Sequence, residues 1–272
     1  RLRDRAANQV RPGMCFVVGS CRYPGSIVDN ALSDKVYAAI ECQITMTAGA
    51  QMLFLIGDQI YADATDQLVE MKSLKAKYTD RYRRAFGAEY SPNFARLVKQ
   101  VPTHFALDDH EKGDDWSGAP SDLPVTPGDS HDYAAAMAAR FLGSGRSSVP
   151  IRGKPCSSLH YYALSHPLEC DFPVFMTDTR SERDYRSSND PGRHCLMADK
   201  QYRALTDWLL QAQRDFPQAP KFIVSGSILA PLPRGYLRAP STWRQQDGWA
   251  GYPRTAESLL RLIAQRGIEK VV

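Results

Sequence analysis

Four apolar runs of strand length end in side chains that commonly bind metals, and this pattern limits the fold more than any other feature. The runs end at VVGSC (17–21), LFLIGDQIYAD (53–63), HFALDDHEKGDDW (104–116) and VFMTDTR (174–180). In an open α/β sheet, the residues just beyond the carboxyl ends of the strands line one crevice. The residues expected to meet there are Cys21, Asp58, Tyr61, Asp109 and His110.

The apolar runs alternate with segments of helical periodicity, which is typical of an α/β fold. The predicted strands cover 14–20, 51–57, 101–107, 159–165, 172–178 and 221–227, and one more strand begins in GIEKVV. The predicted helices cover 31–48, 130–142, 199–214 and 254–266, with two helical segments within 66–99. The polar segments 108–130 and 231–253 are predicted to be long functional loops.

The length of 272 residues fits a single catalytic domain over residues 1–272. The sequence ends inside the apolar run Val271–Val272, whereas domains normally end at exposed positions. We therefore expect the domain to continue beyond Val272.

The charge and hydropathy of the chain bound its partners. A net charge of +4 suits an acidic or phosphorylated ligand but is too small to predict nucleic-acid binding. No apolar run is long enough to span a bilayer, so no transmembrane segment is predicted. The first ten residues contain no apolar core of a signal peptide. The six cysteines include no CxxC pair, which slightly favours the cytoplasm, although a secreted or periplasmic chain without its signal would look the same.

Several common enzyme motifs are missing. The sequence contains no GxSxG nucleophile elbow, no GxxxxGK[ST] phosphate loop, no GxGxxG and no HExxH. These absences argue against a serine hydrolase, a P-loop nucleotidase, a dinucleotide-dependent enzyme and a zincin.

Read together, the motifs resemble the alkaline phosphatase D-like branch of the calcineurin-like metallophosphatases. The residues that carry the resemblance are GSC (19–21), GDQIYAD (57–63), DDHE (108–111) with DDW (114–116), MTDTRSERD (176–184), SGS (225–227) and GWAGYPRTAESLL (248–260). Their order and spacing match across nearly the whole chain, and GDQIYAD followed by DDHE is the most specific part.

The resemblance implies a two-layer β-sandwich core flanked by helices and a multinuclear metal centre. The implied reaction is hydrolysis of a small phosphomonoester or phosphodiester by a metal-bound hydroxide. The implied cofactors are Fe(III) and one or more divalent ions, calcium or another. By position, the metal ligands are Cys21, Asp58, Tyr61 and Asp109, and His110 is the catalytic histidine. The last motif of the family, SGD followed by a His, would come after Val272.

The residue types suit this chemistry. Two metal ions about 3.5–4 Å apart clamp the attacking and leaving oxygens of a phosphoester. A phenolate from Tyr61 favours a ferric ion, and Cys21 offers a thiolate that a metal deprotonates. Asp58 directly follows its strand, where it is placed to bridge two ions. His110 adjoins the ligand Asp109, so it lies where it can protonate a leaving alkoxide.

Arg180 is predicted to be a second catalytic residue that contacts the phosphate through its guanidinium. An ion pair between Asp178 and Arg180 explains the same residues equally well. Arg22, next to Cys21, is a weaker candidate for the phosphate contact.

Each motif also has a plain structural explanation when taken alone. Cys21 and Tyr61 suit core positions, and the carboxylates of DDHE suit a helix N-terminus. A catalytically inactive relative that binds a metal or a phosphorylated ligand is the alternative to the enzyme. A nucleic-acid-binding module rests only on the mild positive charge.

Overall fold

The computed structural model describes the strands and most of the helices that these motifs join. The described residues are 15–22, 30–46, 50–63, 76–114, 116, 149–151, 154–156, 161–164, 172–184, 193–229 and 247–272. The predicted helix at 130–142 and most of the two predicted loops, 108–130 and 231–253, lie outside these ranges.

The first sheet contains three parallel strands in the order β1–β2–β3. These strands are β1 (Cys15–Gly19), β2 (Ala50–Leu55) and β3 (Thr103–Phe105). β1 and β3 lie within predicted strands, and β2 begins one residue before the strand predicted at 51–57. Because the strands are parallel, their carboxyl ends, and the residues that follow them, meet at one edge of the sheet.

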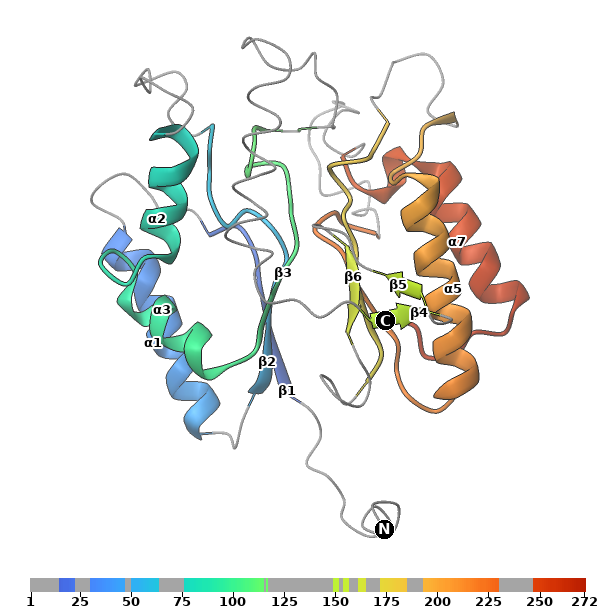
Figure 1. Ribbon diagram of the computed structural model, residues 1–272, viewed down its shortest axis with the longest axis horizontal. Helices are drawn as coiled ribbons and strands as arrows, with labels where there is room; N and C mark the ends of the chain where they lie inside the picture. Colours follow the sequence, from blue (N-terminus) through green and yellow to red (C-terminus); the bar gives the residue numbers. More distant parts are fainter. Residues whose placement is uncertain are drawn as a thin grey trace, which may run out of the picture.

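The helices of the N-terminal half cover one face of this sheet (Figure 1). α1 (Asn30–Met46) connects β1 to β2, and the π-helix η1 (Ala76–Asp80), α2 (Arg81–Phe86) and α3 (Pro92–Gln100) connect β2 to β3. The predicted breaks near Gly87 and at Ser91–Pro92 are confirmed. The carboxylate of Asp34 joins α1 to α3, because it accepts the first backbone N–H groups of α3 from Asn93 at 2.9 Å and Phe94 at 3.0 Å.

The second sheet has the order β6–β7–β8. β6 (Tyr162–Leu164) is antiparallel to β7 (Val174–Met176), and β7 is parallel to β8 (Phe222–Val224). α5 (Asp199–Asp215), the 3₁₀ helix η4 (Trp249–Gly251) and α7 (Pro253–Gln265) belong to this half of the chain. The predicted strand in GIEKVV appears as an isolated parallel bridge between Val271 and Lys221. A short hairpin of β4 (Val149–Ile151) and β5 (Lys154–Cys156) was not predicted.

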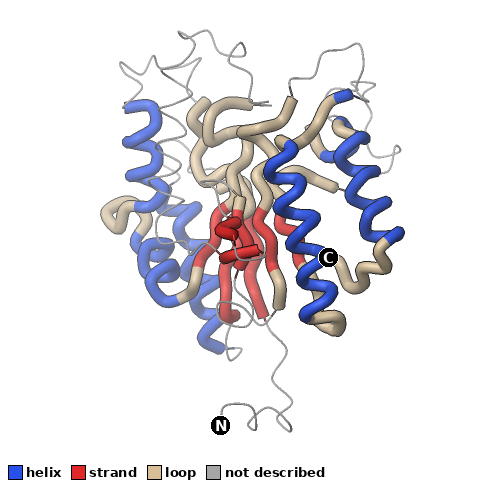
Figure 2. Tube along the Cα trace, turned by 45° about the vertical axis from the view of Figure 1, so that its right-hand side comes forward, coloured by secondary structure: helices blue, strands red, loops and turns tan. Residues whose placement is uncertain are grey.

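Alternate residues of the strands face different layers. Met52 and Phe54 of β2 pack with Tyr162, Leu164, Val174 and Met176 of the other sheet. The intervening Leu53 and Leu55 pack instead with side chains of α1 and α3, and Phe175 of β7 packs with α5 and α7. Figure 2 shows the strands in the middle with helices on both sides. The molecule is therefore a mixed α/β structure in which side chains of the two sheets share one apolar cluster.

Among the described residues, no helix combines the length and hydrophobicity needed to cross a membrane.

Candidate metal centre

The turns after β1 and β2 are fixed side by side by backbone hydrogen bonds. The Cys21 N–H donates to the Gly57 carbonyl at 3.2 Å, and the Arg22 N–H donates to the Asp58 carbonyl at 2.9 Å. Cys21 and Asp58 both have left-handed backbones, with φ of 54° and 56°. Non-glycine residues held in this strained conformation cluster at functional sites. The local backbone thus presents a thiol and a carboxylate next to each other.

Gly57 allows the segment after β3 to approach this turn. Its φ is 121°, and a Cβ atom added to it would lie 2.3 Å from the Cβ of Asp108. Only glycine fits both the backbone conformation and the space. The close approach places Asp108, Asp109 and His110 beside Asp58.

Cys21, Asp58 and Tyr61 form the first part of the cluster. The Tyr61 hydroxyl donates to Asp58 Oδ2 at 3.4 Å, and the Cys21 thiol interacts with both side chains. Burial, and then the neighbouring charge of Asp109, raise the pKa of the Asp58 carboxyl. Burial, followed by the charges of Asp58 and Cys21, also raises the pKa of Tyr61. Cys21, Asp58 and Tyr61 carry no positive charge themselves, and a bound metal ion would favour their ionised forms.

Asp109 and His110 form the second part of the cluster. One ligand atom each from Asp58, Asp109 and His110 lie within 4.8 Å of one another. The His110 ring lies 4.3 Å from the Tyr61 ring between centroids, and its Nδ1 lies 2.8 Å from Asp63 Oδ2. The structure therefore brings together the five residues predicted to meet. His110, which was predicted to lie beside the metal ligands, also offers a possible ligand atom itself.

Glu111 holds the backbone of the cluster in place through hydrogen bonds. Its buried carboxylate accepts backbone N–H groups from Asp58 at 3.1 Å, from Asp108 at 2.9 Å and from Gln59. Glu111 thus ties the turn after β2 to the segment after β3. Sequence reasoning gave it no role, although it is the last residue of the DDHE motif.

Arg180 lies at the rim where the two sheets meet. Its guanidinium contacts Asp108, Asp109 and Asp247, and it also donates to the Trp116 carbonyl at 3.3 Å. The alternative ion pair with Asp178 is wrong, because Asp178 Oδ1 accepts the backbone N–H groups of Arg180 and Ser181, each at 2.9 Å. Arg180 is thus near the predicted ligands but engaged with carboxylates.

Arg22 does not face the cluster, so its weaker prediction as a phosphate contact is wrong. Its guanidinium is buried, donates to Ser91 Oγ at 2.7 Å and to the Ala85 carbonyl, and lies over the Phe94 ring at 4.4 Å. Arg22 instead joins the turn after β1 to α2 and α3.

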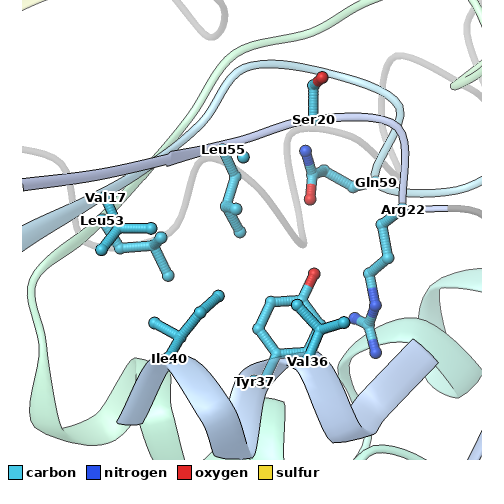
Figure 3. Close-up of a pocket in the computed structure, with 10 residues that line it drawn as sticks. Val17, Ser20, Arg22, Val36, Tyr37, Ile40, Leu53, Leu55 and Gln59 are labelled. Atoms are coloured by element: carbon cyan, nitrogen blue, oxygen red, sulfur yellow. The ribbon is translucent and has the colours of Figure 1, made fainter. Parts of the chain in front are cut away.

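A cavity of about 90 Å³ lies between the first sheet and α1. Gln59 and Tyr37 point into it, and the predicted metal ligands are not part of its lining (Figure 3). The buried atoms Gln59 Oε1 and Arg22 Nε have no hydrogen-bond partner among the described residues. The lining is mostly apolar, and the two unpartnered polar atoms suit a bound water.

The donors of the cluster fit metal ions. Carboxylates suit hard divalent cations, while imidazole and thiolate suit transition metals such as iron. Among the described residues, Asp58, Asp109 and His110 form the group with ligand atoms close enough for one ion. Cys21 and Tyr61 adjoin Asp58, so they extend the donor set around the same carboxylate.

Comparison with known proteins gives consistent matches. The family model described as PhoD-like phosphatase matches residues 34–272. The solved structure of PhoD has a TM-score of 0.64 at 18% sequence identity, over 95% of this chain and 49% of that chain. The purple acid phosphatase PPD1 from yellow lupin (Lupinus luteus) seeds has a TM-score of 0.50 at 15% identity, over 94% of this chain and 36% of that one. No curated protein matches the sequence. This chain therefore spans about half of the length of the PhoD chain and about a third of the length of the purple acid phosphatase chain.

Proposed function

The chain belongs to the PhoD-like phosphatase family, and on that premise we propose that it is a metal-dependent hydrolase of small phosphoesters. The carboxylate cluster at the ends of β2 and β3 is the observation that carries this proposal. Asp58, Asp109 and His110 offer ligand atoms within 4.8 Å of one another.

We assign the metal-binding role to Cys21, Asp58, Tyr61 and Asp109. Asp58 lies between the thiol of Cys21 and the side chains of Asp109 and His110, which suits a carboxylate shared by two ions. The phenol and thiol favour Fe(III) on one side, and the carboxylates favour a divalent ion, calcium or another, on the other. Bound metal ions would supply positive charge to the phosphoryl oxygens and a water of lowered pKa.

The His110 imidazole is the proposed proton donor to the leaving oxygen. Asp63 holds the ring through Nδ1, which leaves Nε2 for a substrate. Burial would lower the pKa of His110, but the carboxylates of Asp109 and Asp63 outweigh it and raise the pKa. A raised pKa favours the protonated imidazole, which is the form that a general acid needs.

The proposed architecture is a two-layer β-sandwich flanked by helices, within one domain over residues 1–272. It is supported by the contacts of Met52 and Phe54 with strands of the other sheet. In this arrangement the ends of β3 and β7 meet at the rim, where Arg180 contacts Asp108 and Asp109.

The test is metal analysis of the purified protein combined with hydrolysis of p-nitrophenyl phosphate and bis-p-nitrophenyl phosphate. Asp58→Asn should lower kcat/KM by more than about a hundredfold, because losing even an outer partner of a ligand costs about 10–100-fold. The fold should persist, since Asn readily adopts the left-handed backbone that Asp58 has.

The two phosphate substrates separate monoesterase from diesterase activity. Full activity of Asp58→Asn would exclude the proposed centre. Bound metal without turnover of either substrate would instead favour the inactive, metal-binding relative.

A further inference from the structure

Arg180 has a protein acceptor near every N–H of its guanidinium. Its Nε contacts Asp108, its Nη1 donates to Asp247 Oδ1 at 2.7 Å and to the Trp116 carbonyl, and its Nη2 donates to Asp247 Oδ2 at 2.6 Å. The Nη2 atom also lies 3.4 Å from Asp109 Oδ1. The side chain is 3% exposed. A phosphate could therefore reach it only by displacing one of these carboxylates.

Asp247 makes the bidentate half of this arrangement. Two parallel N–H···O bonds fix the plane of a guanidinium as well as its position. The adjacent edge of the same guanidinium, formed by Nε and Nη2, then faces Asp108 and Asp109. Asp247 thus fixes the orientation in which the Arg180 guanidinium faces the cluster.

Asp247 is itself anchored. Arg183 Nη1 donates to Asp247 Oδ1 at 2.8 Å, and Arg183 Nη2 donates to Ser227 Oγ at 3.0 Å. The Arg183 guanidinium also lies over the Tyr252 ring at 5.3 Å. Because Asp247 lies between two buried arginines, its negative charge also screens their mutual repulsion.

We propose that Asp247 is a positioning residue that acts through Arg180 to hold Asp109 in place for the metal. This inference rests on the proposed function. It gives Arg180 a role different from the direct phosphate contact predicted from the sequence. Asp247 lies beside the motif GWAGYPRTAESLL, outside the segments that supply the proposed ligands.

The experiment measures metal affinity, which a purely structural ion pair would not change. Competition with a fluorescent chelator gives the affinities of wild type and Asp247→Asn for Ca²⁺ and for Mn²⁺. We expect Asp247→Asn to bind the ions about 10–100-fold more weakly, as is typical when the partner of a ligand is lost. Saturating metal should restore kcat for p-nitrophenyl phosphate to within a few-fold of wild type.

Glu41→Gln is the matched control. Glu41 also forms a bidentate pair with an arginine, since Arg96 Nε lies 2.8 Å from Glu41 Oε1 and Arg96 Nη2 lies 2.5 Å from Glu41 Oε2, but this pair joins α1 to α3 away from the cluster. Its metal affinity should equal that of wild type. Arg180→Lys is a second variant, which keeps the charge but loses the fork, and it should weaken metal binding as Asp247→Asn does.

Two results would overturn the proposal. One is a lower melting temperature of Asp247→Asn with unchanged metal affinity, which would make the pair purely structural. The other is a raised KM with unchanged metal affinity, which would return Arg180 to a phosphate contact. If the wild type binds metal but hydrolyses neither phosphoester, the proposed function fails while the affinity comparison still decides the role of Asp247.

Discussion

At the scale of single residues, the imidazole of His110 depends on a carboxylate from another turn. Asp63 Oδ2 lies 2.8 Å from His110 Nδ1 and also accepts the backbone N–H of Asp114 at 2.9 Å. The carboxylate therefore fixes the ring and the start of the loop that follows it. A histidine held through Nδ1 presents Nε2 in one direction.

Asp63→Asn should lower kcat by about tenfold or more while KM changes little. The reason is that an oriented general acid contributes about 10²–10⁴-fold, of which part is lost when its carboxylate partner becomes neutral. The measurement is the steady-state rate with p-nitrophenyl phosphate. Asp114→Asn is the control. Asp114 is also a carboxylate near His110, but it is exposed and its Oδ1 lies 3.9 Å from His110 Nε2, beyond hydrogen-bond distance. Equal rates for the two variants would contradict the positioning role of Asp63.

The sequence alone located the cluster but not its supports. Cys21, Asp58 and Asp109 each follow a strand, and parallel strands bring such positions to one edge without knowledge of the loops. Asp63, Glu111 and Asp247 act through hydrogen bonds between separate segments. Strand and helix periodicity does not mark such partners. Asp63 and Glu111 are the last residues of the GDQIYAD and DDHE motifs, and this position was the one indication of a role that the sequence offered.

At the scale of elements, strand alternation divides the side chains between layers. Phe54 is 2% exposed and contacts Phe16 edge to face, with ring centroids 5.6 Å apart. Phe16 in turn contacts Phe222 of the other sheet at 5.4 Å. These rings join β2 to β8 across the space between the sheets.

Phe54→Ala should lower the free energy of unfolding by about 3–5 kcal/mol, because the substitution leaves a cavity between the sheets. Val18→Ala on β1 is the control: Val18 is 52% exposed, so we expect a change within about 0.5 kcal/mol. Urea unfolding followed by circular dichroism measures both. A small loss for Phe54→Ala would argue against face-to-face packing of the two sheets.

Helices with a clear period and strands with apolar runs were predictable, even strands of three residues such as β3 and β7, whereas β4 and β5 were not. The helix predicted at 199–214 is observed as α5, Asp199–Asp215, since seventeen residues give many turns of periodicity. β4 and β5 have three residues each and contain Pro150 and Pro155, which mask a strand pattern. Tertiary pairing determines such strands.

At the scale of the whole molecule, the two halves meet through opposite charges at one rim. The turns after β2 and β3 supply Asp58, Asp108 and Asp109, and the segment after β7 supplies Arg180. Burial raises the pKa of Asp108 to about 6, against the opposing effect of Arg180. Burial, followed by Asp109, also raises the pKa of Asp58. The folded, metal-free protein therefore holds protons that the unfolded chain releases near pH 4.

This linkage predicts how metal removal and pH act together. Between about pH 4 and pH 6 the folded state binds more protons than the unfolded state, so the contribution of Asp58 and Asp108 to stability falls as pH rises and stays lower above pH 6. Metal ions at the cluster would replace the proton of Asp58, and their charge would also favour the ionised form of the neighbouring Asp108. At a metal concentration of about 100 times Kd, binding adds about 2.7 kcal/mol to the free energy of unfolding, which corresponds to a rise in Tm of about 5 °C.

Scanning calorimetry of the chelated protein with and without Ca²⁺ or Mn²⁺ should show a larger rise in Tm at pH 7.5 than at pH 5. Asp108→Asn should reduce this difference, and an equal rise at both pH values would contradict metal binding at these carboxylates.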